Sequence, residues 1–182
     1  MPTSRAVCIV APFGQDAKSI ATVLLGHGLK PVVYTDLNAL ALAIGDEVGV
    51  VVLAEESLIG DTSALQRAFL AQPTWSDVPV VLLRAPRSPI GGRPISLPDE
   101  VINVVELERP MSSASLISAV DSALRARFKQ FVLRDQVISL ERSQSALAES
   151  ESELRLIADS LPVLIAFVDV NLVYRFVNLA YE

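Results

Sequence analysis

The chain has 182 residues, of which 51% are hydrophobic and 20% are charged, and its formal net charge is −6. This composition excludes a disordered protein and a basic nucleic-acid-binding surface, and it supplies enough apolar residues for a sizeable core. No apolar stretch is long enough to span a bilayer, and the N-terminus lacks a signal-peptide pattern. Because Cys8 is the single cysteine, an internal disulfide is impossible, and we expect a cytoplasmic protein without a membrane or nucleic-acid partner.

Glycine and proline residues divide the chain into three segments. All eight glycines lie at or before Gly92, and ten of the eleven prolines lie at or before Pro110. Residues 112–161 contain neither, which permits one long helix, and Pro162 begins a third segment. The expected organisation is an N-terminal domain, a long helix and a C-terminal segment, over residues 1–127, 128–161 and 162–182.

Apolar segments in the N-terminal domain predict strands. They are short and rich in β-branched residues, and the strongest are continuous rather than alternating, which is typical of central strands in a parallel sheet. The predicted strands are Ala6–Ala11, Pro31–Thr35, Gly49–Ala54, Val78–Leu83 and Val101–Val105.

Helix-like segments lie between these strands. The predicted helices are Asp16–Leu25, Leu37–Ile44 and Thr62–Ala71. Asp36 is the expected N-cap of the second helix, and Leu65, Phe69 and Leu70 are expected to share the buried face of the third. The alternation of strands and helices predicts a doubly wound α/β fold with a parallel five-stranded sheet. The proline-rich stretch from Arg84 to Pro98 is expected to be a loop.

Three sequence features resemble the receiver domain of two-component regulators, a flavodoxin-like fold, over roughly residues 4–127. They are a strand ending in VVVLA, the segment WSDVPVVLLRA, and ERP before an amphipathic helix. In that family an acidic pair after the first strand binds a divalent cation, and an Asp at the end of the third strand accepts a phosphoryl group. A hydroxyl residue ends the fourth strand and a Lys-Pro pair ends the fifth. The carboxylates hold the metal, and the metal and the Lys neutralise phosphoryl charge.

This chain departs from the receiver pattern at each of the reactive positions, although the proline of the Lys-Pro pair is present as Pro110. The acidic pair falls on Ala11 and Pro12, the phosphoacceptor on Ala54, the hydroxyl on Arg84, and the Lys on Arg109. Alanine offers no nucleophile, and without the acidic pair we expect no metal ion and no cofactor. The resemblance therefore implies a pseudo-receiver, which has the receiver fold without its chemistry and is not an enzyme.

Other residues give weaker indications of a site. Glu55 and Glu56 directly follow Ala54, and we expect them to begin a solvated loop. A register shift of one residue would instead place Glu55 at the phosphoacceptor position, where its carboxylate would mimic a permanent negative charge. His27, the only histidine, lies between two glycines and is expected to be an ordinary surface residue.

Two heptad series follow Ser112 and Ser113, either of which can cap the long helix. The first series, expected to cover the sheet, is Ile117, Leu124, Phe131 and Ile138, with Val120 and Phe128 beside it. The second series, offset by two positions, is Leu133, Leu140, Leu147, Leu154 and Leu161. The apolar stripe therefore changes face between about residues 131 and 140, from the N-terminal domain to a partner helix.

The second series predicts a coiled-coil homodimer. A helix over residues 112–160 would be about 70 Å long, more than the domain can cover. The expected interface is Val137, Leu140, Gln144, Leu147, Glu151, Leu154, Ala158 and Leu161. Gln144 and Glu151 weaken this interface and either fix its register or ease a switch, and the pattern leaves parallel and antiparallel pairing open. The alternative is one amphipathic helix folded back on its own domain.

The C-terminal segment resembles the opening of a PAS sensor domain. Pro162 disfavours helix at Leu161 and so ends the long helix. Ile165–Asp169 and Tyr174–Val177 predict a hairpin, and the motifs ESELRLIADSLPVLIAFVD and YRFVNLAYE carry the resemblance. We expect a truncated part of a longer protein, whose two strands fray, pair with a partner's copy or pack on the helix.

Together these segments resemble the N-terminal region of a bacterial PAS-containing sensor histidine kinase. The expected function is non-catalytic signal input and dimerisation, with relay through the helix to the PAS and kinase domains of the same chain. The alternatives are an atypical receiver that accepts a phosphoryl group and a purely structural dimerisation module.

Overall fold

The computed structural model describes residues 6–86 and 96–181. The chain divides into two compact units, Met1–Leu133 and Arg134–Glu182. The division lies inside the long helix α4 (Ser113–Ser160). The functional domain boundaries expected at residues 127 and 161 stay predictions. No helix among the described residues is both long enough and apolar enough to cross a membrane.

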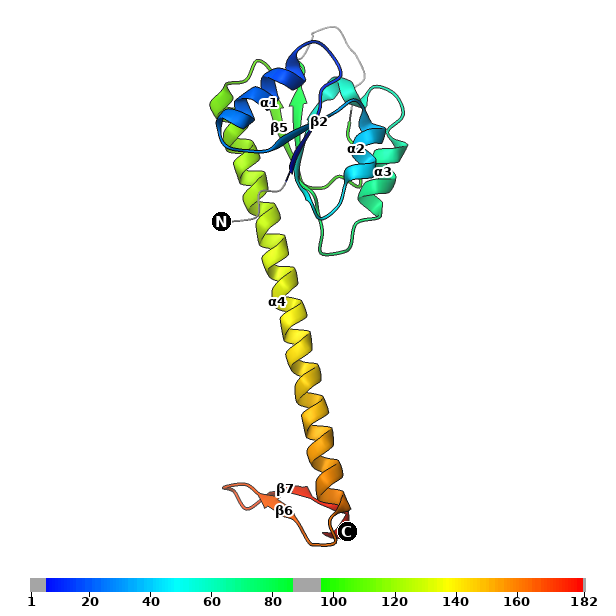
Figure 1. Ribbon diagram of the computed structural model, residues 1–182, viewed down its shortest axis with the longest axis vertical. Coiled ribbons are helices and arrows are strands. Elements are labelled where there is room, and N and C mark those ends of the chain that lie inside the picture. Colours follow the sequence, from blue (N-terminus) through cyan, green and yellow to red (C-terminus); the bar gives the residue numbers. More distant parts are fainter. Residues whose placement is uncertain (1–5, 87–95, 182) are drawn as a thin grey trace. The chain divides into compact units, whose positions relative to one another are not determined.

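The first unit is built on a parallel five-stranded sheet (Figure 1). Its strands are β1 (Ala6–Val10), β2 (Pro31–Tyr34), β3 (Val48–Ala54), β4 (Val80–Arg84) and β5 (Val104–Glu108). They lie in the order β2-β1-β3-β4-β5, and each neighbouring pair is parallel. The three central strands are almost wholly buried, as their continuous apolar sequences predict.

Helices cover both faces of this sheet. Helix α1 (Asp16–Gly26) and the first part of α4 cover one face, whereas α2 (Leu37–Ala43) and α3 (Ser63–Leu70) cover the other. Because side chains alternate along a strand, β1 contributes Cys8 and Val10 to one core cluster and Val7 and Ile9 to the other. The expected doubly wound α/β fold is confirmed.

Strand β5 lies three residues further along the chain than predicted. Its sequence alternates apolar and acidic residues, because an edge strand needs burial on fewer sides than a central one. Residues 101–105 form a more continuous apolar segment, which is why the strand was predicted there. Val101 is buried, but it lies in a turn, where its N–H donates to the carbonyl of Pro98 at 3.0 Å.

Local signals predicted the short helices well. The Oδ1 atom of Asp36 accepts a hydrogen bond from the N–H of Ala39 at 2.8 Å, which confirms the expected N-cap of α2. In α3 the side chains of Leu65 and Phe69 are buried, but Leu70 is 64% exposed. Leu70 was wrongly placed on the buried face, since five residues after Leu65 the helix has turned well away from the core.

The connection from β4 to β5 has no helix in its described parts, residues 85–86 and 96–103. This agrees with the expected loop, although Arg84, its predicted first residue, is the last residue of β4. The middle of that stretch, residues 87–95, lies outside the described residues.

The first part of α4 packs on the sheet through a face that only partly matches the predicted one, with Val120 and Phe131 buried as expected. Ser112 caps the helix, its Oγ accepting from the N–H of Ser115 at 3.0 Å. The buried residues are Leu116, Ala119, Val120, Ala123, Arg127 and Phe131. Ile117 and Leu124 are only partly buried, and Phe128 is 46% exposed. Two alanines and an arginine lie on the buried face, and a search for large apolar residues does not detect them.

The second unit contains the rest of α4 and a C-terminal hairpin. Residues 135–157 of the helix are all exposed in the single chain. The helix ends at Ser160, which confirms the effect expected of Pro162. Strands β6 (Ala166–Val168) and β7 (Tyr174–Val177) pair antiparallel, as predicted, and are followed by a 3-10 turn, η2 (Leu179–Tyr181).

A buried asparagine joins the hairpin to the end of α4. The Nδ2 of Asn178 donates to the carbonyls of Ala158 at 2.9 Å and Val163 at 2.8 Å, and its Oδ1 accepts from the N–H of Ile165 at 2.8 Å. The Oδ1 of Asp159 also accepts from the N–H of Leu179 at 2.8 Å. Of the three outcomes expected for the two strands, the structure therefore shows packing on the helix.

Candidate functional site

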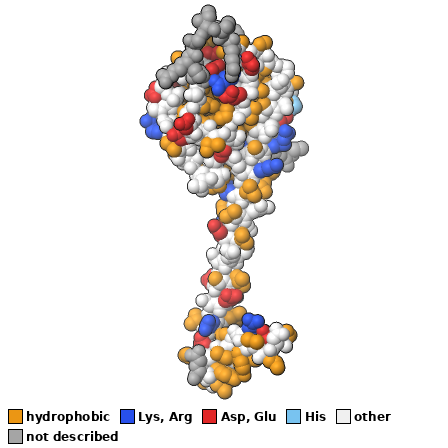
Figure 2. Space-filling view, turned by 180° about the vertical axis from the view of Figure 1, so that it is seen from behind, with side chains coloured by type: hydrophobic (Ala, Val, Ile, Leu, Met, Phe, Trp, Pro, Cys, Tyr) orange, Lys and Arg blue, Asp and Glu red, His pale blue; other side chains and the backbone are white. Residues whose placement is uncertain are grey.

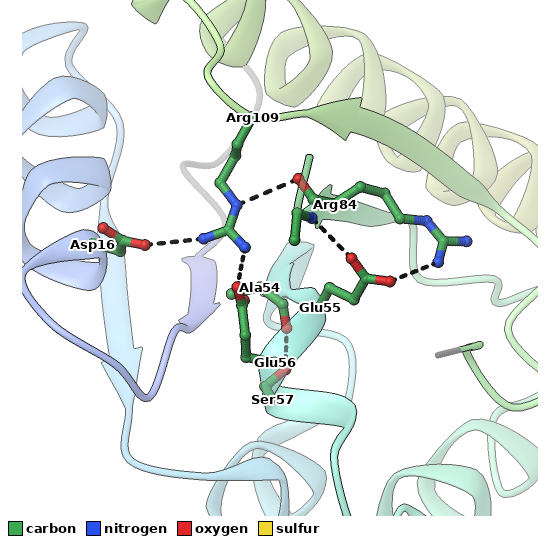
Figure 3. Close-up of polar contacts among 8 residues, drawn as sticks. Asp16, Ala54, Glu55, Glu56, Ser57, Arg84 and Arg109 are labelled. Atoms are coloured by element: carbon green, nitrogen blue, oxygen red, sulfur yellow. Dashed lines mark hydrogen bonds and ion pairs between the residues drawn. The ribbon is translucent and has the colours of Figure 1, made fainter. Parts of the chain in front are cut away.

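The five positions predicted to correspond to the receiver site lie at the carboxyl edge of the sheet. Ala11 and Pro12 follow β1, Ala54 ends β3, Arg84 ends β4, and Arg109 follows β5. The carboxyl ends of parallel strands meet at one edge, so the fold gathers residues that are distant in sequence. In receivers this edge holds charged groups that act on a phosphoryl group, and here it also carries a cluster of charged side chains (Figure 3).

The guanidinium of Arg109 links two carboxylates from different elements. Its Nη1 donates to Oδ2 of Asp16 at 3.0 Å, and its Nη2 pairs with Oε1 of Glu56. Asp16 begins α1, and Glu56 lies in the 3-10 helix η1 (Glu55–Leu58), directly after β3. The backbone N–H of Arg109 also donates to the carbonyl of Arg84 at 3.0 Å, which ties it to the end of β4.

Arg84 forms a second ion-pair group at the same edge. Its Nη1 donates to Oε1 of Glu55 at 3.1 Å, and its Nη2 donates to Oε1 of Glu106 at 2.6 Å. The other oxygen of Glu55 accepts from the N–H of Ala85 at 2.8 Å. The hydrogen bond to Glu106, with a further contribution from Glu55, raises the pKa of Arg84 above its already high ordinary value. This arginine is therefore charged at every physiological pH.

Glu55 and Glu56 do not begin a solvated loop, so this prediction was wrong. Both lie in η1, and the side chain of Glu55 is only 14% exposed. Ala54 is the last residue of β3 and pairs with Leu83, whereas its match to the phosphoacceptor position stays a prediction. The signal that could have revealed their role is the pair of arginines at neighbouring strand ends, since partly buried guanidinium groups need carboxylates nearby.

Ala54 brings no reactive group to the site. Its side chain is buried, and its carbonyl accepts a hydrogen bond from the Oγ of Ser57 at 2.6 Å. The nearest carboxylates along the chain, Glu55 and Glu56, are each engaged by an arginine. Across residues 6–86 and 96–181, no group of three or more His, Cys, Asp and Glu is placed to hold a metal ion. The described edge is therefore held by ion pairs within the chain.

Sequence reasoning missed Glu106 altogether. The predicted last strand ended at Val105, so the acidic residue beside it was not considered as part of the edge. In the structure Glu106 belongs to β5, and its backbone pairs with Leu82 of β4. A correct strand boundary would have placed this carboxylate within reach of the strand that carries Arg84.

A shallow cavity of about 260 Å³ adjoins the ion pairs. Its lining combines apolar and polar side chains: Val10, Pro12, Phe13, Thr35, Asp36, Leu37, Glu56, Ser57 and Ile59. Its carboxylates are already engaged, because Asp36 caps α2 and Glu56 pairs with Arg109. The hydroxyl of Ser57 donates to Ala54, so these groups serve the fold itself.

His27 takes the ordinary surface place expected of it, and Cys8 is a core residue. His27 is the C-cap of α1, and its exposed ring lies 3.3 Å from Oδ2 of Asp121. Cys8 is fully buried in β1, where burial raises the pKa of its thiol. A raised pKa disfavours the reactive thiolate, so this cysteine packs as a small apolar residue.

No protein-family model matches the chain, and no curated protein matches it either. Solved structures do match. A response regulator receiver domain protein from Bacillus halodurans aligns at 15% identity and a TM-score of 0.52, over 66% of this chain and 97% of that one. The response regulator StyR aligns at 18% identity and a TM-score of 0.66, over 87% of this chain and 79% of that one.

A third match comes from a multidomain protein. It is the N-terminal domain of a response regulator/sensory box/GGDEF 3-domain protein from Carboxydothermus hydrogenoformans, at 20% identity and a TM-score of 0.52. The match covers 70% of this chain and 99% of that one. At such low identities these likenesses establish the fold, and the first unit of the chain has the fold of a response regulator receiver domain.

Proposed function

We propose that this chain is the non-catalytic regulatory and dimerisation region of a sensor histidine kinase. In this proposal the first unit is a pseudo-receiver that cannot be phosphorylated, and α4 relays its signal to a PAS domain. The observation that carries the proposal is the pairing of Arg109 with Asp16 and Glu56 beside Ala54, the residue at the phosphoacceptor position.

The chemistry of phosphoryl transfer supports the loss of phosphoacceptor activity. A receiver needs an unblocked carboxylate as nucleophile and a divalent cation to neutralise charge. Ala54 has only a methyl group, and the carboxylates of Glu55 and Glu56 are held by Arg84 and Arg109. Each of these two carboxylates, like Asp16 and Glu106, has an arginine partner within the chain, and in this proposal that pairing replaces the nucleophile and the metal ion of a receiver.

The exposed leucines of α4 support the proposed homodimer. Leu140, Leu147 and Leu154 are 60%, 61% and 65% exposed in the single chain. Burying a leucine side chain contributes about 1.5–3 kcal/mol, so a paired stripe would supply a large part of a dimerisation energy. Gln144 and Glu151 interrupt the stripe, and they make the pairing weaker and therefore easier to rearrange.

The hairpin supports the link to a PAS domain. It carries large apolar side chains on its surface, among them Phe167, Val170 and Leu172, which are 61%, 98% and 85% exposed. Figure 2 shows hydrophobic side chains gathered over this hairpin. Two strands form an incomplete sheet. Exposed apolar side chains of this kind are what further strands of the same sheet would cover. Together with the PAS-like sequence, this favours continuation into a sensor domain.

Treatment with acetyl phosphate and Mg²⁺, followed by intact-mass measurement, tests the pseudo-receiver. We expect no added phosphoryl group, while a receiver with an intact acidic pair, treated in parallel, should gain one. An adduct on this chain would overturn the proposal and favour the atypical phosphoryl-accepting receiver.

Replacing both Leu147 and Leu154 with Asp tests the dimer. We expect a monomer by light scattering, because four buried carboxylates would face each other or apolar groups. Ser145→Asp, on the exposed outer face of the proposed coiled coil, is the matched control and should stay dimeric. A double variant that remains a dimer would move the interface to the first unit.

A purely structural dimerisation module is the second candidate. The leucine stripe favours it, because paired leucines can hold two chains together without any signal input. Deletion of residues 1–110 from the full-length protein separates the two proposals. Signal input predicts a change in kinase activity or in its regulation. Unchanged activity and regulation would favour the structural module.

A further inference from the structure

One arginine is completely buried where α4 leaves the sheet. Arg127 has no exposed surface and lies against two aromatic rings. Its guanidinium carbon is 5.7 Å from the ring centroid of Trp75 and 4.6 Å from that of Phe131. The two rings are 5.1 Å apart in an edge-to-face arrangement. A cation that lies over an aromatic face is attracted to it, and this interaction has a preferred geometry.

The same guanidinium is bonded to two separate loops. Its Nη2 donates to the carbonyl of Gly45 at 3.5 Å, in the loop before β3, and its Nε donates to the carbonyl of Val48 at 3.3 Å, at the start of that strand. Its Nη1 donates to the Oγ of Ser76 at 2.8 Å, in the turn before β4. It also donates to Oε1 of Gln130, one turn further along α4, at 2.7 Å. One side chain of the helix thus touches both loops at the amino edge of the sheet.

Gln130 extends this network along the turn before β4. Its Nε2 donates to the carbonyl of Asp77 at 2.8 Å, and its Oε1 accepts from the N–H of Asp77 at 3.2 Å. Within that turn, Oε1 of Gln72 accepts from the Oγ of Ser76 at 3.0 Å and from the N–H of Val78 at 3.2 Å. The contact between α4 and this turn therefore consists of directional hydrogen bonds, and the turn itself is held by further hydrogen bonds.

This polar contact differs in kind from the packing earlier in α4. There, Leu116, Val120 and the alanines near them lie on the sheet through apolar contacts. Apolar packing is not directional, and small residues tolerate rotation or sliding of a helix. Hydrogen bonds need particular distances and angles. The hydrogen bonds around Arg127 therefore restrict the rotation of α4, which apolar packing alone restricts less. Beyond Arg127, residues 135–157 of the helix are exposed.

We propose that Arg127 is a positioning residue that fixes the rotation of α4 as the helix leaves the sheet, by bonding it to residues 45–48 and 72–78. A movement of either loop would then turn the helix, and a turn of the helix would move the loops. This inference rests on contacts within the first unit. It stands whether or not the chain belongs to a signalling kinase.

Distances between paired spin labels test the proposal on the whole chain. Cys8→Ala provides a background without the native thiol. One label is placed at Leu42→Cys, which is 92% exposed on α2. The second is placed on α4, either at Ser118→Cys, before Arg127, or at Lys129→Cys, after it, since both residues are exposed. Electron–electron double resonance then reports each distance distribution.

We expect Arg127→Met to broaden or shift the 42–129 distribution and to leave the 42–118 distribution unchanged. Arg127→Lys should give the same result, because an ammonium cannot span the acceptors that a planar guanidinium reaches. Arg125→Met, which removes an exposed arginine two positions away on α4, is the matched control and should change neither distribution.

Two results would overturn the proposal. Unchanged distributions in Arg127→Met would mean that apolar packing alone positions the helix. Equal broadening of both would mean that Arg127 supports overall stability without positioning the helix. If Arg127→Met does not fold, Gln130→Ala decides the matter, because it removes the bonds to Asp77 while leaving Arg127 in place. An unchanged 42–129 distribution in that variant would also reject the proposal.

Discussion

The two edges of the sheet use arginine in opposite ways. At the carboxyl edge, Arg84 and Arg109 are partly exposed and pair with carboxylates. At the amino edge, Arg127 is buried and bonds to backbone carbonyls, a hydroxyl, an amide and aromatic rings. Exposed ion pairs contribute little to stability, whereas a buried cation is costly to disturb. We therefore expect substitutions at the carboxyl edge to affect folding less than substitutions at the amino edge.

The largest effect on stability is expected at the amino edge. Arg127→Ala should lower the free energy of unfolding by about 3 kcal/mol, because it leaves a cavity and several buried acceptors without a donor. Urea denaturation followed by the fluorescence of Trp75 measures the change, since this tryptophan is the only one in the chain and contacts Phe131 in the same cluster. If the free energy of unfolding falls only as much as it does when an exposed arginine is replaced, the two edges do not differ.

A smaller effect is expected at the carboxyl edge. Arg109→Met should lower the free energy of unfolding by about 1 kcal/mol or less, because its partners Glu56 and Asp16 are partly exposed and screened by water. A double-mutant cycle with Glu56→Gln isolates the pair. Its coupling energy should shrink at high salt. A coupling energy that is large and insensitive to salt would show that the two edges are energetically alike.

The response to pH should also differ between the edges, beginning with Asp77 at the amino edge. Burial raises the pKa of this carboxyl, although the charge of Arg127 acts in the opposite direction. A raised pKa penalises the ionised form in the folded state, so this penalty is absent in acid and grows as the pH rises above about 4. Asp77→Asn should therefore raise the melting temperature at pH 7 more than at pH 3. The reverse order would contradict this assignment.

The smallest effect is expected at Asp36, which follows β2 at the carboxyl edge. The hydrogen bond from Ala39, with a further one from Thr35, lowers the pKa of this carboxyl. Its contribution to stability is present above about pH 4 and is lost as the pH falls further. Asp36→Asn keeps a capping side chain but removes the titration. The melting temperature of this variant, compared with that of the unchanged chain, should therefore be relatively higher at pH 3 than at pH 7. A difference that is the same at both pH values would argue against the cap as the cause.

Sequence alone predicted the features that depend on local pattern. Continuous apolar runs located β1, β3 and β4, a capping aspartate located the start of α2, and Pro162 located the end of α4. These signals work because a buried parallel strand, an N-cap and a helix break each have their cause in neighbouring residues. The receiver resemblance placed Ala54 and Arg109 at the carboxyl edge for a similar reason, since their positions follow from strand ends.

The features that were missed depend on residues distant in sequence. Nothing near Glu56 indicates that Arg109 will lie beside it, because the fold alone brings η1 and the end of β5 together. Arg127 was missed because a charged residue on a helix is ordinarily exposed, and its burial becomes visible only with Trp75 and Val48 in place. Small alanines concealed the buried face of α4 for the same reason.

Binding of Mn²⁺ tests most directly the claim that arginines have replaced a metal ion at the carboxyl edge. Mn²⁺ is paramagnetic, so a bound ion broadens the NMR signals of nearby amides. Our account predicts that amides of residues 11, 13–16, 54–57 and 84–85 keep their intensity as Mn²⁺ is added, because Arg109 and Arg84 already engage the carboxylates there. Selective loss of those signals at low Mn²⁺ would show a metal site and contradict the pseudo-receiver.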